Sequence, residues 1–392
     1  MSFDANDLVW LIPLLLPLAV ASGWFAARFE RTRHPGKSFD LPAAYIKGLN
    51  LLLNEQPDKA IEMFIRALEV NSETVETHLA LGSLFRRRGE VERAIRIHQN
   101  LIARPTLDKE QRSQALLELG QDYLKAGLLD RAENLFLELA EIRHHSEQAL
   151  RQLLHIYQQE KEWEKAIAVT RKLARISGKN LNDTIAQYYC ELAEQAYAKR
   201  NFAVAREYLA QAFTADEGCV RASILQGDLY ADEGQLQDAI KAWQHVEDQD
   251  VHYLGEVAAR IARTYRQLGD TQGLYDYFRT TLNRHGGIAL ALAFAEVVRD
   301  RDGVEAAEKF VVDWLRRRPN VHGLHQLIVL NLVEIAGTAR DDLLLLKGII
   351  EELRAQHLGY ACVQCGFKGK SLHWLCPGCS RWNTIKPVQE DE

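Results

Sequence analysis

Residues 79–95 read LALGSLFRRRGEVERAI, and this stretch decides the fold. It places Gly82 twelve positions before Ala94, with Gly89 between them. A small residue on one helix and an Ala on the next allow two helices to pack closely. Gly89 can end the first helix in a left-handed conformation, because glycine lacks the Cβ atom that hinders it. The stretch therefore predicts a helix, a tight turn and a second helix.

The same arrangement recurs along the middle of the chain. Gly48 with Ala60 precedes it by 34 residues, and residues 117–133, LELGQDYLKAGLLDRAE, repeat it with Gly120 and Ala132. Weaker copies contain the pairs Leu154 and Ala166, Ala193 and Ala205, and Gly227 and Ala239. Tetratricopeptide repeats have this spacing, and such arrays bury a core by stacking neighbours and form an extended concave binding surface. We therefore expect an all-α superhelix of about eight to nine helix pairs at residues 43–358.

Side chains on the first helix of each pair have two predicted roles. Aromatic residues three positions after the small residue are expected in the core: Phe85, Tyr123, Tyr157 and Tyr230. Residues beside the small position, and the basic run after it, are candidate partner contacts: Ser83, Arg86, Arg87, Arg88, Gln121, Leu124 and Lys125. An ordinary solvated face is the simpler interpretation of any one of them. The basic run fits an acidic peptide, or it ends a helix with favourable charge.

The start of the chain has a different composition. Residues 8–27, LVWLIPLLLPLAVASGWFAA, contain no charged residue, and at about 1.5 Å per residue a helix of this length spans roughly 30 Å of hydrocarbon. Basic residues follow it, as is typical of the cytoplasmic side, whereas a cleaved secretory signal would begin with basic residues. We expect a transmembrane anchor at residues 1–27, a basic linker at residues 28–42, and a cytoplasmic location for the remainder.

The end of the chain contains two CxxC pairs separated by ten residues. Residues 360–387 read YACVQCGFKGKSLHWLCPGCSRWNTIKP, and the paired residues are Cys362, Cys365, Cys376 and Cys379. Four thiolates from two tight turns complete a tetrahedron around one soft metal ion, iron or zinc, and leave no position for a substrate. We therefore expect residues 359–392 to form a structural metal module, with His373 as a bystander.

Composition and missing motifs limit the other functions. The net charge of -6 is spread over 392 residues, and the chain contains no phosphate-binding loop, GxSxG or HExxH motif. We expect neither an enzyme nor a nucleic-acid partner. Three alternatives remain: an iron site that passes one electron, a general repeat-based assembly factor, and a zinc ribbon that contacts nucleic acid. The last would depend on Lys368, Lys370, Arg381 and Trp382.

With anchor, repeats and metal module in this order, the chain resembles the lipopolysaccharide assembly protein B family over essentially its whole length. The most specific matches are GLNLLLNEQPDKAIEMF at residues 48–64, HLALGSLFRRRGEVERAIRIHQNL at 78–101, and CGF with LHWLCPGCSRWNTIKP near the end. The resemblance implies a single-pass protein of the bacterial inner membrane whose bulk faces the cytoplasm. It also implies a rubredoxin-like module in which the four cysteines bind one iron or zinc ion.

The resemblance further implies the role of an adaptor. Members of that family help a membrane-anchored ATP-dependent protease to degrade the deacetylase that commits carbon to lipid A, a UDP-acyl-GlcNAc deacetylase. Other inner-membrane regulators of lipopolysaccharide are further expected partners, and a homodimer remains open. A full rubredoxin has a wider gap between its cysteine pairs than ten residues, which argues against electron transfer here.

Overall fold

The computed structural model describes residues 75–105, 107–142, 145–332, 335–356 and 358–388, together with Lys47, Gly48, Asn50, Leu51 and Lys59. The predicted anchor and basic linker lie outside these residues, as does most of the first predicted repeat. Among the residues that the structure describes, no helix is both long enough and apolar enough to cross a membrane.

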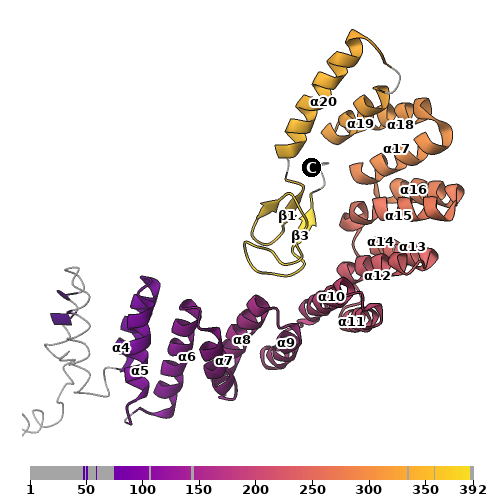
Figure 1. Cartoon of the computed structure of the whole chain (residues 1–392). Coiled ribbons are helices and arrows are strands. Elements are labelled where there is room, and N and C mark those ends of the chain that lie inside the picture. Colours follow the sequence, from indigo (N-terminus) through magenta and orange to yellow (C-terminus); the bar gives the residue numbers. More distant parts are fainter. Residues whose placement is uncertain are drawn as a thin grey trace, which may run out of the picture. The chain divides into compact units, whose positions relative to one another are not determined.

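Helices follow one another from residue 75 to residue 356, as the sequence predicts (Figure 1). They are α4 (Val75–Arg87), α5 (Val91–Ile102), α6 (Lys109–Lys125), α7 (Leu129–Ala140), α8 (Ser146–Glu160), α9 (Trp163–Ser177), α10 (Asn182–Ala198), α11 (Phe202–Ala215), α12 (Val220–Asp232), α13 (Leu236–Gln244), α14 (Val246–Gln249), the 3-10 helix η2 (Val251–Tyr253), α15 (Leu254–Leu268), α16 (Thr271–His285), α17 (Ile288–Asp302), α18 (Val304–Arg317), α19 (Val321–Asn331) and α20 (Thr338–Gln356). The predicted helical repeat array is therefore confirmed across this range.

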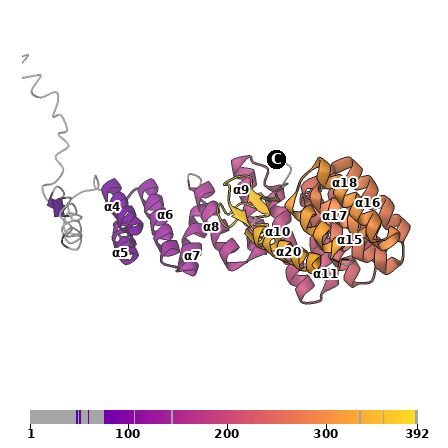
Figure 2. The ribbon, with the colours of Figure 1, turned by 90° about the horizontal axis from the view of Figure 1, so that it is seen from above.

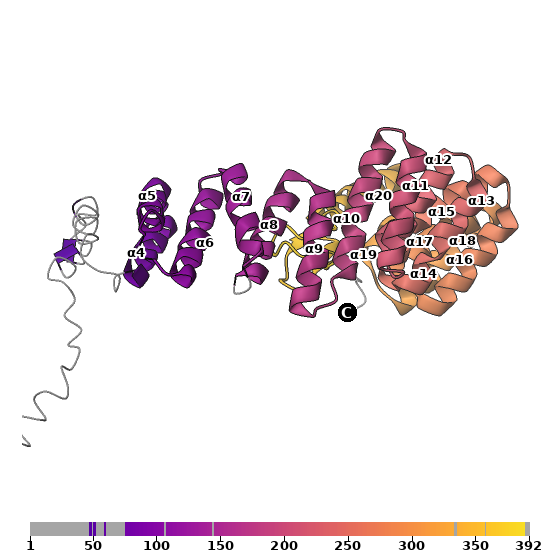
Figure 3. The same cartoon turned by 90° about the horizontal axis from the view of Figure 1, so that it is seen from below.

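Consecutive helices pack as pairs, which form two compact units along the chain. The pairs include α4 with α5, α8 with α9, α10 with α11, α12 with α13, and α17 with α18. The first unit ends at Leu135 and the second begins at Phe136. Within the second unit, α15 to α18 lie side by side (Figures 2 and 3).

The small residues of the repeat frame admit a large ring from the paired helix. A Cβ atom on Gly82 would lie 2.3 Å from Nε2 of His98, and one on Gly227 would lie 2.3 Å from Nε1 of Trp243. In both pairs the ring comes one helical turn after the expected Ala, which is fully buried. The predicted close approach is therefore confirmed, and the space that glycine leaves is filled by His98 or Trp243 rather than by the Ala alone.

The turns between paired helices have the predicted left-handed residue. Gly89, Gly127 and Gly234 have φ angles of 85°, 74° and 78°. Lys161 and Arg200 occupy the same place after α8 and α10, each with φ of 58°. A left-handed conformation costs a residue other than glycine on the order of 1 kcal/mol, so stacking of the helices must hold these two turns.

The aromatic residues of the first helices lie largely in the core, as predicted. Phe85, Tyr123 and Tyr157 are buried. Tyr230 is only partly buried, and it packs against the main apolar cluster of the second unit. That cluster extends from Val220 on α12 to Leu330 on α19, so a continuous core joins neighbouring helix pairs.

The chain after α20 forms three short antiparallel strands. They are β1 (Tyr360–Cys362), β2 (Lys368–Gly369) and β3 (Ile385–Pro387), in the order β2-β1-β3. Tyr360 pairs with Gly369 on one side and with Pro387 on the other. Figure 1 shows this sheet directly after α20, and its strands position the two cysteine turns.

Candidate metal centre and repeat surfaces

The two CxxC pairs occupy two similar turns. In the first turn, the backbone N–H of Gly366 donates to the carbonyl of Cys362 at 3.0 Å. In the second, the N–H of Ser380 donates to the carbonyl of Cys376 at 2.8 Å. Gly366 and Ser380 follow the second cysteine of their pair and have positive φ angles of 74° and 53°. Each turn therefore bends back at the same place and presents two sulfurs to one side.

The four sulfurs meet at one point. The Sγ atoms of Cys362, Cys365, Cys376 and Cys379 all lie within 4.8 Å of one another. Across the two turns, Cys362 Sγ lies 3.8 Å from Cys379 Sγ, and Cys365 Sγ lies 3.7 Å from Cys376 Sγ. A tetrahedron with metal–sulfur bonds of about 2.3 Å has edges of about 3.8 Å. These cysteines therefore fit one tetrahedral metal ion, and the geometry suits iron and zinc equally.

Gly378 has a different role from Gly366. The sequence predicts that both glycines give the backbone room to turn, but only Gly366 has a positive φ angle. A Cβ atom on Gly378 would lie 3.2 Å from Cys365 Sγ and 3.3 Å from Phe367 Cβ. Gly378 therefore lets the second turn approach a sulfur of the first.

Hydrogen bonds favour the charged form of one sulfur. Burial opposes ionisation of the Cys362 thiol, but the Thr384 hydroxyl and two backbone N–H groups favour its thiolate and lower its pKa to about 6. The backbone N–H of Phe367 favours the Cys365 thiolate, yet desolvation and the neighbouring sulfurs raise the pKa of that thiol to about 12. A bound cation would offset the repulsion among four thiolates.

His373 and the other two cysteines do not join the site. The Nε2 atom of His373 lies 3.1 Å from the hydroxyl of Ser371, at the surface, and His373 is not among the residues that converge on the site. Cys190 and Cys219 lie in the repeat core with their Sγ atoms 3.8 Å apart. The four-cysteine cluster is the one group of three or more metal-ligating side chains within the described part of the chain.

Aromatic residues of the repeats hold the module through Trp382. Its ring packs edge-on against Trp163 at the start of α9, with centroids 5.9 Å apart, and against Tyr188 on α10 at 5.6 Å. All three residues are buried. The sequence predicts that Trp374 and Trp382 pack over the metal or against the last repeat helices; Trp382 instead lies on α9 and α10, far earlier in the chain.

Arg221 lies at the centre of this interface, although no motif in the sequence distinguishes it. Its guanidinium lies 5.8 Å from the ring centroid of Trp374 and 5.9 Å from that of Trp382. It also forms ion pairs with Glu191 at 2.7 Å and Glu194 at 2.9 Å, while its side chain is only 3% exposed. The available signal was a single charge within the apolar start of α12.

Polar contacts fix the sheet of the module to η2 and α15. The Tyr253 hydroxyl donates to the carbonyl of Ile385 at 2.9 Å, and the Tyr253 ring stacks on Trp374 with centroids 5.5 Å apart. The Tyr360 hydroxyl donates to Glu256 at 2.7 Å. Burial raises the pKa of Tyr253 and Tyr360, so both hydroxyls keep the proton that they donate. These bonds align β1 and β3 against the repeats.

The structure separates the predicted partner contacts of the first unit into two groups. Arg86 pairs with Glu118 at 2.6 Å and with Asp122 at 2.7 Å, and it also donates to Gln121. Ser83 donates to Glu118. Arg87, Arg88 and Lys125 are exposed, and Leu124 is partly exposed. The internal ion pairs of Arg86 reduce its capacity to receive an acidic peptide, whereas the exposed basic residues remain candidates.

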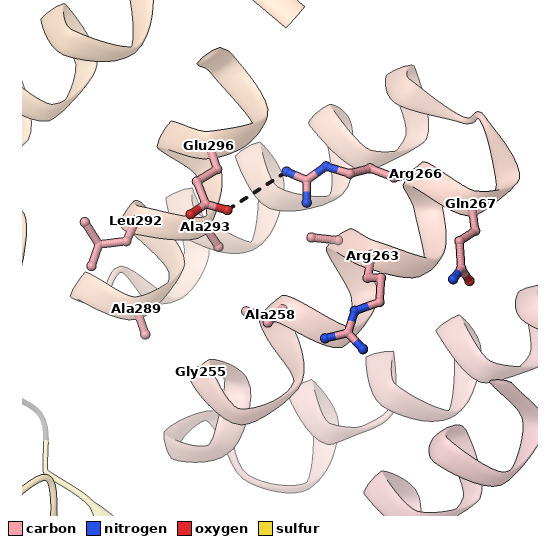
Figure 4. Close-up of a pocket in the computed structure, with 11 residues that line it drawn as sticks. Gly255, Ala258, Arg263, Arg266, Gln267, Ala289, Leu292, Ala293 and Glu296 are labelled. Carbon is pink, nitrogen blue, oxygen red and sulfur yellow. Dashed lines mark ion pairs between the residues drawn. The ribbon is translucent and has the colours of Figure 1, made fainter. Parts of the chain in front are cut away.

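A groove of about 620 Å³ lies between α15 and α17, the first helices of neighbouring pairs (Figure 4). Gly255, Ala258 and Ala259 line it on α15, and Ala289 and Ala293 line it on α17. Charged residues surround this apolar floor: Arg263, Arg266 and Glu296. Arg266 reaches across to Glu296 at 4.0 Å and pairs with Asp300 at 2.8 Å. The sequence did not indicate this groove.

Known protein families match both the repeats and the metal module of this chain. A model described as rubredoxin metal binding domain matches residues 360–387, and tetratricopeptide repeat models match residues 77–113 and 190–247. Among solved structures, the complex of Naa15 and Naa10 bound to HypK-THB is 14% identical, covers 76% of this chain and 45% of that chain, and superimposes with a TM-score of 0.44.

Full-length relatives share one name. Lipopolysaccharide assembly protein B of Escherichia coli strain K12 is 38% identical over 381 residues, which is 97% of this chain and 98% of that protein. Lipopolysaccharide assembly protein B of Haemophilus influenzae is 36% identical over 98% of this chain and 100% of that protein. The repeats, the four-cysteine module and this full-length similarity agree: the chain belongs to the lipopolysaccharide assembly protein B family.

Proposed function

We propose that this protein is a membrane-anchored adaptor that regulates lipopolysaccharide synthesis and catalyses no reaction itself. In this proposal the segment at residues 1–27 spans the bacterial inner membrane once, and the repeats and metal module face the cytoplasm. The observation that supports an adaptor best is that the four-sulfur site is closed and docked on the repeats. A metal with four protein ligands has no open position for a substrate, so its role is to hold the module in place.

The proposed clients are a membrane-anchored ATP-dependent protease and the deacetylase of the lipid A pathway. The adaptor brings the two together, so that the deacetylase is degraded and lipopolysaccharide supply is limited. Other inner-membrane regulators of lipopolysaccharide would bind the same adaptor. The family name of the full-length relatives supports the pathway, and the groove between α15 and α17 supports recognition of a protein segment.

The charges at this groove favour an acidic client segment. Among the described residues, Arg263 has no ion-pair partner, whereas Arg266 is paired with Asp300. Alanine and glycine on the floor leave room for a partner backbone to approach closely, and an acidic side chain of that partner would pair with Arg263. We propose that the deacetylase or the protease contributes this segment.

The half-life of the deacetylase in cells tests the proposal. In cells that lack their own copy of the adaptor, the full chain should shorten this half-life, whereas residues 28–392 should fold and leave the deacetylase stable. Full activity of the truncated chain would contradict the need for an anchor. A deacetylase half-life that is unaffected by the full chain would contradict the adaptor role itself.

A substitution in the groove tests where the client binds. Ala259→Glu fills the floor and places a negative charge near Arg263, so it should stabilise the deacetylase in cells. Ala210→Glu is the matched control, because Ala210 is an exposed alanine on α11, outside the groove. If Ala259→Glu retained full activity, the client would have to bind elsewhere.

A further inference from the structure

The last helix of the repeat array exposes a row of large apolar side chains. Leu345, Leu346, Ile349 and Leu353 on α20 are 66%, 47%, 48% and 52% exposed. At 3.6 residues per turn, these four positions fall within about 100° of the helix circumference. Single exposed leucines are ordinary on protein surfaces, but a contiguous apolar patch marks an interaction site. We call these four residues the α20 stripe.

The stripe lies on the side of α20 that faces away from its neighbour in the array. On the opposite side, Glu351 pairs with His325 of α19 at 3.3 Å and with Lys347 at 3.1 Å. Ile350, between the two sides, is buried. The terminal unit of a repeat array normally presents a polar outer face, because no further repeat covers it. The α20 stripe departs from this rule.

Acidic residues border the stripe, whereas the basic residues Arg340, Lys347 and Arg354 fall outside it on α20 by helical position. Asp341, Asp342 and Glu352 lie on or beside the stripe by helical position, and within the described residues none of them forms an ion pair. Arg340 donates to the carbonyl of Leu332 at 2.8 Å, and Lys347 is paired with Glu351. The border of the apolar surface is therefore negative.

We propose that the α20 stripe binds an amphipathic helix of another protein whose apolar face is flanked by Lys or Arg. Leucines at positions three and four apart match the apolar face of a second helix. The negative border selects a basic flank, because an acidic one would be repelled. A second copy of this chain would bring like charges together, and an anionic bilayer would also be repelled. This surface is separate from the metal centre and from the groove between α15 and α17.

Two model peptides test the proposal with the full chain. Both have about 18 residues and leucines at the same helical positions, and their other residues are Lys in one and Glu in the other. Fluorescence anisotropy should show that the Lys peptide binds and the Glu peptide does not. The double variant Leu345→Gln/Leu353→Gln should weaken binding of the Lys peptide about tenfold or more, because two apolar contacts are lost.

Two further variants distinguish binding at the α20 stripe from nonspecific binding of the Lys peptide to the protein surface. Val363→Gln is the matched control, because Val363 is an exposed apolar residue of the metal module, 74% exposed, and binding should not change. The variant Asp342→Asn/Glu352→Gln should weaken binding of the Lys peptide and reduce its salt dependence. Gln favours helix and Asn has about the same helix propensity as Asp, so the substitutions in α20 should leave its fold intact, which circular dichroism checks.

Other outcomes would overturn the proposal. Equal binding of the two peptides would show that the acidic border does not select the partner. Unchanged binding by the Leu345→Gln/Leu353→Gln variant would show that the stripe is not the site. If the chain self-associates, and this variant abolishes the self-association, the occupant is a second copy. Stripe-dependent binding to vesicles of phosphatidylglycerol would assign the surface to a membrane.

Discussion

The second unit contains two cores that are stabilised in different ways. In the repeats, buried side chains from α12 to α19 form one continuous apolar cluster, so each helix pair is supported by its neighbours. Among the described residues of the metal module, the buried cluster around the sulfurs consists of Cys362, Cys376 and Ile385, and the buried Trp382 packs on the repeats instead. So short a segment cannot bury enough apolar surface to fold alone. The repeats thus distribute their stability, whereas the module depends on a metal ion and on side chains that the repeats supply.

Metal removal should have the largest effect on stability, and the unfolding should be confined to the metal module. Structural zinc sites contribute about 10–16 kcal/mol to the folding of small domains. Chelation, or the variant Cys376→Ser, should therefore abolish hydrogen-exchange protection at residues 360–387 while α17 and α18 keep theirs. Val363→Ser, an exposed position in the first turn, is the control and should change neither region. Continued protection of the module without metal would remove the distinction between the two cores.

An added methyl group should change the free energy of unfolding in opposite directions at two helical glycines. Gly227→Ala places a Cβ atom 2.3 Å from the Trp243 ring, which is buried and donates to the carbonyl of Ile224 at 3.2 Å. Because the ring cannot move freely, this variant should lower the free energy of unfolding by about 3 kcal/mol. Gly348→Ala meets no atom within 4 Å and should raise it by about 0.5–1 kcal/mol. Denaturant unfolding measures both, and equal effects would contradict the close approach at Gly227.

Arg221 contacts both cores, and its substitution should destabilise the packing of the metal module on the repeats. Arg221→Met removes the ion pairs to Glu191 and Glu194 and the cation from the faces of two tryptophans. Both glutamates are partly exposed and can be hydrated, so we expect a loss of about 2 kcal/mol. Proteolysis within residues 360–387 should accelerate, while metal content stays the same. Arg221→Lys keeps the charge without the planar group and should restore only part of the stability.

The repeat frame and the four-cysteine set could be predicted from the sequence because both depend on short-range spacing. Gly82 with Ala94 recurs at a fixed separation, and Cys362 with Cys365 forms one turn. The left-handed conformation at Gly89 follows from the same local pattern. Such features are encoded within about one repeat, so periodicity and turn chemistry reveal them.

The contacts between the two cores could not be predicted, because their partners are far apart in the chain. Tyr253 meets Ile385, and Trp163 meets Trp382, across more than one hundred residues. No local pattern distinguishes Trp163 from any other core aromatic. The sequence predicts helix as far as residue 358, but which residues of α20 are exposed depends on the packing of α19 against the opposite side.

Removal of one hydroxyl tests the polar contact between the cores. Tyr253→Phe eliminates the hydrogen bond to the carbonyl of Ile385 at 2.9 Å and the longer one to Oδ1 of Asn383 at 3.3 Å, and it keeps the ring on Trp374. The free energy of unfolding of the metal-loaded chain should fall by about 1 kcal/mol. Tyr265→Phe is the matched control within the repeats, where the hydroxyl only accepts a longer bond from Gln244 at 3.3 Å. A larger loss for Tyr265→Phe would show that the hydroxyl of Tyr253 does not secure the module.

The smallest effect should come from a turn within the repeats, where stacked neighbours tolerate local strain. Lys161→Gly relieves the left-handed conformation after α8, and part of the gain is lost to the greater freedom of glycine in the unfolded chain. We expect stabilisation of about 0.5 kcal/mol. Gly127→Ala is the reverse change at the matching turn after α6; no atom lies within 4 Å of the added methyl, so it should destabilise by about 1 kcal/mol through its φ angle alone. Thermal unfolding of both variants measures these two changes in stability. A Lys161→Gly chain that is less stable than the wild type would show that this lysine stabilises the turn through contacts of its side chain.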